Sequence, residues 1–117
     1  MRKIFLLEDD QGIREVLEIL LFSENYSVLS FSSIAEFMER DILVVPDLYL
    51  FDVMLPDGSG IDLCRELKKD HDDGVPVLIM SAHAELRNLE GICDADDFIR
   101  KPFDIEHLLN RVRLALV

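Results

Sequence analysis

Basic residues are scarce in this sequence. Of its 117 residues, 12 are Lys or Arg and 24 are Asp or Glu, which gives a formal net charge of −12. A surface that neutralises a phosphate backbone, or that lies on anionic lipid, needs the opposite balance. We therefore expect no direct contact of this chain with nucleic acid or with a membrane.

Cysteine and long apolar runs are scarce as well. The two cysteines, Cys64 and Cys93, stand far apart and neither belongs to a C-x-x-C pair, so a disulfide framework or a zinc site has little support. The apolar run at residues 4–7 is too short for a signal peptide, and no run approaches the roughly 20 residues of a membrane span. We expect buried thiols and a cytoplasmic protein.

Linkers, low-complexity tracts and internal repeats are absent from the sequence. A length of 117 residues suits one domain, and a hydrophobic content of 50% excludes a disordered chain. We expect a single folded domain over residues 1–117.

Short apolar runs alternate with longer amphipathic segments about five times, which is typical of β–α units around a parallel sheet. The apolar runs are mostly continuous, as expected for strands covered by helices on both faces. Five strands are predicted, at residues 4–7, 28–31, 48–51, 77–80 and 98–99.

Apolar residues at helical spacing predict amphipathic helices between these strands. A cap at Asp10 opens the first helix, a Ser33–Glu36 capping box opens a short second helix, and Asp104 opens the last one. The predicted apolar stripes are Ile13, Val16, Leu17, Leu20 and Leu21; Ile34, Phe37 and Met38; Ile61, Cys64 and Leu67; and Ile105, Leu108, Leu109, Val112 and Leu116. Residues 85–93 give the weakest helical pattern.

Charged or hydroxyl side chains follow four of the five predicted strands. In chain order they are Glu8-Asp9-Asp10, Asp52, Ser81 and Lys101-Pro102, whereas the second strand ends in Ser32-Ser33. Open α/β sheets bind their ligands beyond the carboxyl ends of the strands. We therefore expect these residues to form one site.

The carboxylates of Glu8, Asp9 and Asp52 would converge in this site. Carboxylates this close repel one another, so they must take up protons or share a cation. Mg²⁺ suits such a site because it is usually held by one or two carboxylates and keeps several waters. With a positive charge from Lys101 and a hydroxyl from Ser81, Asp52 fits the role of a nucleophile that forms an acyl phosphate.

Each residue has a simpler explanation when it is taken alone. An acid after a strand often caps the next helix, which is the favoured explanation for Asp10, and Lys101 would be a solvated charge. Ser81 would be a helix cap or a turn residue, and a lone Asp52 would serve a turn as readily as a reaction. Asp57 is assigned to the turn Pro56-Asp57-Gly58. The joint placement at strand ends, and not any single residue, favours a phosphate site.

Four blocks of the sequence resemble a known family in order and spacing. They are Leu6-Leu7-Glu8-Asp9-Asp10; Pro46-Asp47 leading to Asp52-Val53-Met54-Leu55-Pro56-Asp57-Gly58-Ser59-Gly60; Val77-Leu78-Ile79-Met80-Ser81-Ala82; and Asp96-Asp97-Phe98-Ile99-Arg100-Lys101-Pro102-Phe103. Over essentially the whole chain, the sequence resembles the receiver domain of bacterial two-component response regulators. The resemblance implies the flavodoxin-like (βα)5 fold, a doubly wound parallel sheet with strand order 2-1-3-4-5.

The resemblance also implies the ligands of a magnesium ion. Asp9 and Asp52 would bind Mg²⁺ directly, Glu8 would act through water, and the backbone carbonyl of Met54 would complete the protein's share. Asp52 would be the phosphoacceptor as well.

The other matching residues would pair with the phosphoryl group or respond to it. Lys101 would pair with the phosphate, Ser81 would turn its hydroxyl to a phosphoryl oxygen, and Phe98 would change rotamer. Phe98 lacks the hydroxyl of the commoner tyrosine, but the rotamer change does not need it. Pro102 is similar to the family's cis proline.

The segment 102–113 looks most like receivers that precede a winged-helix DNA-binding domain, the OmpR/PhoB type. Such receivers form homodimers through the fourth helix, fifth strand and fifth helix, which here would pair Asp97 with Arg111. His107 stands where this subfamily often has an acid, which would weaken the pairing or make it pH-dependent. The stretch between Ser81 and Phe98 is slightly short for the subfamily. We therefore expect a short or irregular fourth helix.

The sequence thus predicts a phosphoacceptor domain at the N-terminus of a longer regulator. A sensor histidine kinase would phosphorylate Asp52 with Mg²⁺, and the domain would catalyse only its own phosphorylation and dephosphorylation. Transcription would be controlled through a following DNA-binding domain. Two alternatives stay open. An aspartate-nucleophile phosphatase resembles this pattern but has a second acid where Met54 stands, and an unphosphorylated receiver-like interaction module often loses one of the acids or the lysine.

Overall fold

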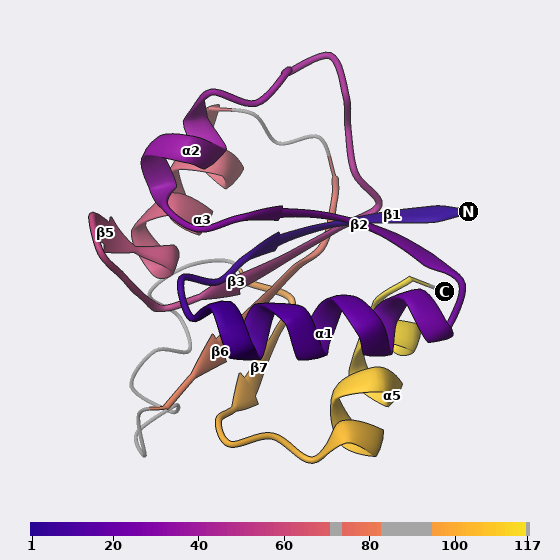
Figure 1. Ribbon diagram of the computed structural model, residues 1–117. Coiled ribbons are helices and arrows are strands. Elements are labelled where there is room, and N and C mark those ends of the chain that lie inside the picture. Colours follow the sequence, from indigo (N-terminus) through magenta and orange to yellow (C-terminus); the bar gives the residue numbers. More distant parts are fainter. Residues whose placement is uncertain (71–73, 83–94, 117) are drawn as a thin grey trace.

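The central element of the computed structural model is a sheet of five parallel strands (Figure 1), and the structure describes residues 1–70, 74–82 and 95–116. The strands are β1 (Arg2–Leu7), β2 (Tyr26–Phe31), β3 (Leu48–Asp52), β6 (Val77–Ser81) and β7 (Asp97–Arg100), in the order β2-β1-β3-β6-β7. A short antiparallel hairpin, β4 (Met54–Leu55) and β5 (Gly58–Ser59), follows β3. The sheet strands alone give the order 2-1-3-4-5, which confirms the predicted fold.

Helices cover both faces of the sheet. Figure 1 shows α1 (Gln11–Ser23) and α5 (Ile105–Ala115) on one face, and α2 (Ile34–Met38) and α3 (Gly60–Asp70) on the other. The weak helical pattern at 85–93, and Cys93 with it, lies outside the described residues. In the part of the chain that the structure describes, no helix has the length and hydropathy to cross a membrane.

The predicted caps open the helices. Asp10 Oδ1 accepts a hydrogen bond from the amide of Ile13 at 3.0 Å, and Asp104 Oδ1 accepts one from the amide of His107 at 3.0 Å. At α2, Ser33 Oγ accepts from the amide of Glu36 at 3.1 Å. The return bond of the capping box differs from the expected one, because the Glu36 carboxylate accepts from Ser32 and not from the amide of Ser33.

Alternation along the strands divides the core into two parts. On β1, Phe5 and Leu7 pack toward α2 and α3, whereas Ile4 and Leu6 pack toward α1 and α5. The first part is aromatic, with edge-to-face contacts at ring centroid distances of 5.2 to 6.1 Å that involve Phe5, Phe31, Phe37, Tyr49 and Phe51. The second part is mainly aliphatic. Both faces of every central strand are therefore covered, as the continuous apolar runs predicted.

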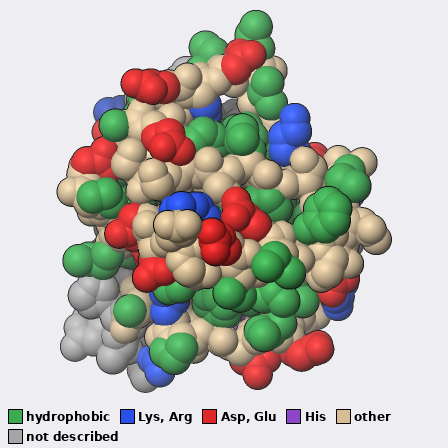
Figure 2. Space-filling view, in the orientation of Figure 1, with side chains coloured by type: hydrophobic (Ala, Val, Ile, Leu, Met, Phe, Trp, Pro, Cys, Tyr) green, Lys and Arg blue, Asp and Glu red, His purple; other side chains and the backbone are tan. Residues whose placement is uncertain are grey.

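The predicted stripes are wrong at three positions. Val16, Met38 and Ile105 were expected to face the core, but each side chain is about half exposed, and Ile19 and Phe22 on α1 are more exposed still. Figure 2 shows hydrophobic side chains gathered over α1. Apolar residues surround most of this helix, so their spacing alone does not single out the face that Leu17 and Leu21 bury.

The aromatic core generates a test of the packing with two phenylalanines. Phe37 is fully buried and contacts three other rings, whereas Phe22 is 68% exposed. Phe37→Ala should lower the free energy of unfolding by about 3–5 kcal/mol, because it leaves a cavity among rings that cannot close it. Phe22→Ala should change it by less than about 0.5 kcal/mol. Denaturant titration measures both, and equal losses would contradict this division of the core.

Candidate functional site

The residues predicted to form the site lie together at the carboxyl edge of the sheet. Glu8 and Asp9 follow β1, Asp52 ends β3, Ser81 ends β6, and Lys101 follows β7. Parallel pairing of β1 with β3, β3 with β6 and β6 with β7 places these four ends side by side. The expected clustering is therefore present in the fold.

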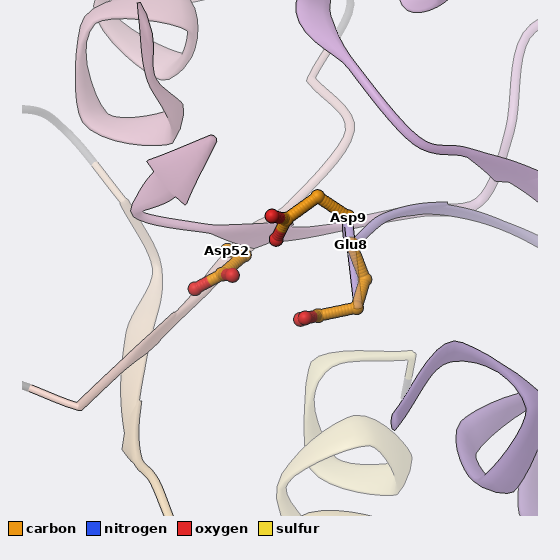
Figure 3. Close-up of side chains that lie close together, drawn as sticks. All are labelled: Glu8, Asp9 and Asp52. Atoms are coloured by element: carbon orange, nitrogen blue, oxygen red, sulfur yellow. The ribbon is translucent and has the colours of Figure 1, made fainter. Parts of the chain in front are cut away.

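The three acids form a compact group. One carboxylate oxygen from each of Glu8, Asp9 and Asp52 lies within 4.8 Å of the others. Figure 3 shows the side chains of Glu8 and Asp9 extending from the end of β1 toward Asp52 on β3. Glu8 and Asp52 are buried, whereas Asp9 is exposed, so the group opens to solvent on the side of Asp9.

Lys101 is the cation of this site. Its Nζ lies 2.7 Å from Glu8 Oε2 and 3.3 Å from Asp52 Oδ2. Its backbone amide donates to the carbonyl of Ser81 at 2.7 Å, and the Lys101–Pro102 peptide bond is cis, as the resemblance implies. The contact between Lys101 and Glu8 was not foreseen, because sequence reasoning placed the lysine opposite the acids as a partner for phosphate only.

Burial dominates the electrostatics of the acids. Burial raises the pKa of Asp52, the charge and hydrogen bond of Lys101 lower it, and the nearby charge of Asp9 raises it, so the pKa stays above its ordinary value. The pKa of Glu8 is also raised by burial and by Asp52, and lowered by its bond to Lys101. With one lysine among three carboxylates, two negative charges are left without a partner inside this group.

The donor set of this group fits a divalent cation. All of its ligand atoms are carboxylate oxygens, which hard ions such as Mg²⁺ prefer, and a charge of +2 equals the uncompensated negative charge. The exposed side of the group leaves room for the waters that Mg²⁺ keeps. The cluster of Glu8, Asp9 and Asp52 could therefore hold a metal ion.

The turn after Asp52 is tightly packed. The amide of Val53 donates to the carbonyl of Met80 at 3.1 Å, and the amide of Gly60 donates to the carbonyl of Val53 at 3.0 Å. A Cβ atom at Gly60 would lie 2.0 Å from the carbonyl oxygen of Asp52. Gly60 was foreseen only as part of a matching block, because a close approach between backbone segments leaves no mark in the sequence other than the glycine.

Arg14 on α1 supports the acidic turn from outside. Its Nη1 donates to the carbonyl of Glu8 at 3.0 Å and lies 3.4 Å from the carbonyl of Asp9. Sequence reasoning missed this residue, because an arginine on an amphipathic helix gives the same pattern as a surface charge.

Asp57 does more than form a turn. It lies with Pro56 in the loop of the β4–β5 hairpin, which confirms the predicted turn. Its carboxylate also accepts hydrogen bonds from the amides of Ile34 and Ala35 on α2, at 2.9 and 2.8 Å. These two bonds lower the pKa of Asp57 below its ordinary value. No spacing in the sequence indicates a contact between segments 22 and 23 residues apart.

The predicted output residues lie next to the site. Ser81 is fully buried, and Phe98 on β7 is half-buried and packs against the aromatic part of the core. Arg111 Nη1 lies 2.9 Å from Asp97 Oδ2 in the same chain, where the resemblance implied a contact across a dimer. His107 is exposed in the first turn of α5.

The match to known sequences is direct. The family model of the response regulator receiver domain matches residues 4–113. The chain belongs to this family. The response regulator ArlR of Staphylococcus epidermidis is 35% identical over an alignment of 118 positions, which covers 99% of this chain and 53% of ArlR. ArlR of Staphylococcus saprophyticus is 36% identical over the same share. This receiver domain thus spans about half the length of the curated relatives it matches.

Solved structures agree with the fold of this receiver domain. The non-phosphorylated HemR receiver domain from Leptospira biflexa is 33% identical, with a TM-score of 0.87, over 99% of this chain and 94% of HemR. DrrB of Thermotoga maritima, described as an OmpR/PhoB homolog, is 30% identical, with a TM-score of 0.85, over 97% of this chain and 51% of DrrB.

The raised pKa values of the receiver domain's two buried acids predict how stability depends on pH. In the folded state Asp52 and Glu8 keep protons above their ordinary pKa values of 3.8 and 4.5, where the unfolded chain has already lost them. The unfolded state then binds fewer protons, so without divalent ions the free energy of unfolding should fall as pH rises through this window.

Asp52→Asn should therefore have a higher free energy of unfolding than the wild type at neutral pH. The difference between the two proteins should become smaller as the pH is lowered toward the ordinary pKa of an aspartate. Lys101 keeps its 2.7 Å contact with Glu8 in this variant. Denaturant titration in EDTA across this pH range measures the effect, and Glu66→Gln, at an exposed position on α3, is the control. A variant less stable than the wild type at neutral pH would contradict the prediction.

Gly60 generates a second test of the receiver domain's site. Gly60→Ala should lower the free energy of unfolding by about 1–3 kcal/mol, because the new methyl group forces the turn away from the Asp52 carbonyl. At Gly12, an added Cβ would lie 3.3 Å from Asp10 Oδ1. Gly12→Ala should therefore lower the free energy of unfolding by less than Gly60→Ala does. Denaturant titration measures the free energy of unfolding of both variants. An equal decrease in the two would contradict the prediction, because it would show that the turn at Gly60 can move to make room for the methyl group.

Proposed function

We propose that this receiver domain accepts a phosphoryl group on Asp52 from a phosphohistidine of a sensor histidine kinase, with Mg²⁺ as the cofactor. The observation that carries the proposal is the position of the Asp52 carboxylate. It is buried among acids at the edge of the sheet, and Lys101 Nζ lies 3.3 Å from its Oδ2. Membership of the receiver family supports the same role.

The residues that would hold Mg²⁺ are Asp9 and Asp52 directly, Glu8 through water, and the backbone carbonyl of Met54. When bound, Mg²⁺ would neutralise the acids and stabilise the charge of a transferring phosphoryl group. Without it, the negative charge of the acids would repel the phosphoryl group, since among the described residues Lys101 is the one cation that forms an ion pair with these carboxylates.

The transfer exchanges one bond for another. A carboxylate oxygen of Asp52 attacks phosphorus, the P–N bond of the phosphohistidine breaks, and the imidazole nitrogen leaves with the electron pair. Lys101 then pairs with the phosphoryl oxygens and loosens its contact with Glu8, while Ser81 donates its hydroxyl to a phosphoryl oxygen. Asp52 is restored when water hydrolyses the acyl phosphate. In this scheme the domain catalyses only its own phosphorylation and dephosphorylation.

The output face is made by β7 and α5. Phosphorylation would shift the equilibrium between two conformations of this face. Phe98 changes rotamer on β7, and Asp97 and Arg111, which pair within the chain at 2.9 Å, form the same pair across a homodimer. Transcription would then respond through a DNA-binding domain after the receiver. The OmpR/PhoB homolog DrrB, 30% identical to this chain, supports that output. The proposed place of action is the cytoplasm.

Acetyl phosphate tests the proposal without a kinase. Incubated with acetyl phosphate and Mg²⁺, the chain should gain the mass of one phosphoryl group, because acetate leaves as histidine would. Asp52→Asn should gain none, EDTA should abolish the gain, and Asp62→Asn should behave as the wild type.

Four results would contradict the proposal. The first is no mass gain in the wild type, and the second is an equal gain in Asp52→Asn. The third is steady hydrolysis of a small phosphoester, which would favour the phosphatase. The fourth is a chain with no response to Mg²⁺ in stability or spectra, which would favour the interaction module.

A further inference from the structure

We propose that Asp57 is a positioning residue that fastens helix α2 to the turn carrying Asp52 and so sets the affinity of the site for Mg²⁺. This inference rests on the proposed function, because it concerns the ion that the acid cluster would hold. Asp57 is exposed and is not a member of that cluster. It acts through the backbone that it holds.

The first step is the contact itself. Each carboxylate oxygen of Asp57 takes one amide of α2: Oδ1 accepts from Ile34 at 2.9 Å and Oδ2 accepts from Ala35 at 2.8 Å. Both bonds have an ionised acceptor, which makes them stronger than bonds between neutral groups. The carboxylate is thereby fixed in position and orientation at the start of the helix.

The second step is what α2 would lose without this contact. The helix has five residues, too few to be stable by itself, and its first amides need partners from outside. Asp57 provides those for Ile34 and Ala35, and Ser33 Oγ provides that for Glu36. Two of these three bonds at the start of α2 therefore come from the hairpin.

The third step leads from Asp57 to Asp52. The hairpin pairs Met54 with Ser59 and Leu55 with Gly58, so its loop and its base move together. At the base of the hairpin, Gly60 lies so close to the carbonyl of Asp52 that no free space separates the two backbone segments. A shift of the loop therefore displaces the backbone that carries Asp52 and Met54.

The fourth step leads from α2 to Glu8. The helix follows β2, and the last residue of that strand, Phe31, accepts a hydrogen bond at its carbonyl from the amide of Glu8 at 3.0 Å. Two residues, Ser32 and Ser33, separate this carbonyl from the first residue of α2. The start of α2 is thus tied to both acid-bearing segments, to Glu8 through β2 and to Asp52 through Asp57.

A second close contact strengthens the link between hairpin and helix. A Cβ atom at Gly58 would lie 2.8 Å from Cδ1 of Ile34, and the backbone of Gly58 has a φ of +155°. The hairpin therefore lies against α2 through a residue with no side chain. Both the hydrogen bonds and the packing hold the same two segments together.

The test compares Mg²⁺ affinity in two acid-to-amide variants. Asp57→Asn keeps one acceptor oxygen and loses the other, so one amide of α2 loses its partner. The Kd for Mg²⁺ should rise about tenfold, the lower end of the range for residues that orient a metal's ligands. Asp62→Asn is the matched control, because Asp62 is an exposed acid in the first turn of α3 and pairs only loosely with Arg65, at 3.8 Å. Its Kd should change less than twofold. Calorimetric titration with MgCl₂ measures all three proteins.

A second readout needs no variant. Coupling is reciprocal, so Mg²⁺ should alter the NMR shifts and slow the hydrogen exchange of the Ile34 and Ala35 amides in the wild type. A merely structural role for Asp57 would leave these two amides unchanged by the ion.

The outcomes separate the two proposals. Equal Mg²⁺ affinity in the wild type and Asp57→Asn would overturn the role of Asp57 and leave the proposed function intact. The same holds if Mg²⁺ binds without changing the NMR shifts or the hydrogen exchange of the Ile34 and Ala35 amides. A wild type that binds no Mg²⁺ would overturn the proposed function itself. An equal loss of affinity in Asp57→Asn and Asp62→Asn would assign the effect to charge alone and would also overturn the positioning role.

Discussion

Crowding of negative charge at one edge of the sheet is the constraint on which the site depends. Three carboxylates share a space in which their oxygens lie within 4.8 Å, and Glu8 and Asp52 are buried there. Isolated buried carboxylates would neutralise by taking up protons, and a lysine 2.7 Å from one and 3.3 Å from the other offsets part of that tendency. The remaining negative charge is why this cluster could hold a metal ion.

The fold brings these groups together from distant parts of the chain. Four strand ends supply them, and Lys101 reaches Glu8 across 93 residues of sequence. The rigidity comes from a core divided by the sheet, with rings packed edge to face under α2 and α3 and aliphatic side chains under α1 and α5. The strand ends that carry the site therefore belong to elements packed on a shared core.

The strands, and the gathering of charged residues at their carboxyl ends, could be predicted from local patterns in the sequence. The strand order came from the resemblance to the receiver family. Continuous apolar runs mark strands covered on two faces, and a charged residue directly after such a run falls at the carboxyl edge of a parallel sheet. Contacts between side chains and distant backbone could not be predicted. The bonds from Asp57 to α2 and from Arg14 to the carbonyl of Glu8 depend on how segments meet in space. The buried face of α1 was predicted except at one position, because Ile13, Leu17, Leu20 and Leu21 pack in the core whereas Val16 is half exposed.

The ion pair between Asp97 and Arg111 has a thermodynamic consequence for any self-association through β7 and α5. Each chain already satisfies both groups internally at 2.9 Å, so two chains that swap these partners end with the same number of pairs as before. Such an exchange would leave the number of ion pairs unchanged, so it would add little free energy to the association. The free energy that holds such a pair of chains would then have to come from contacts other than this ion pair.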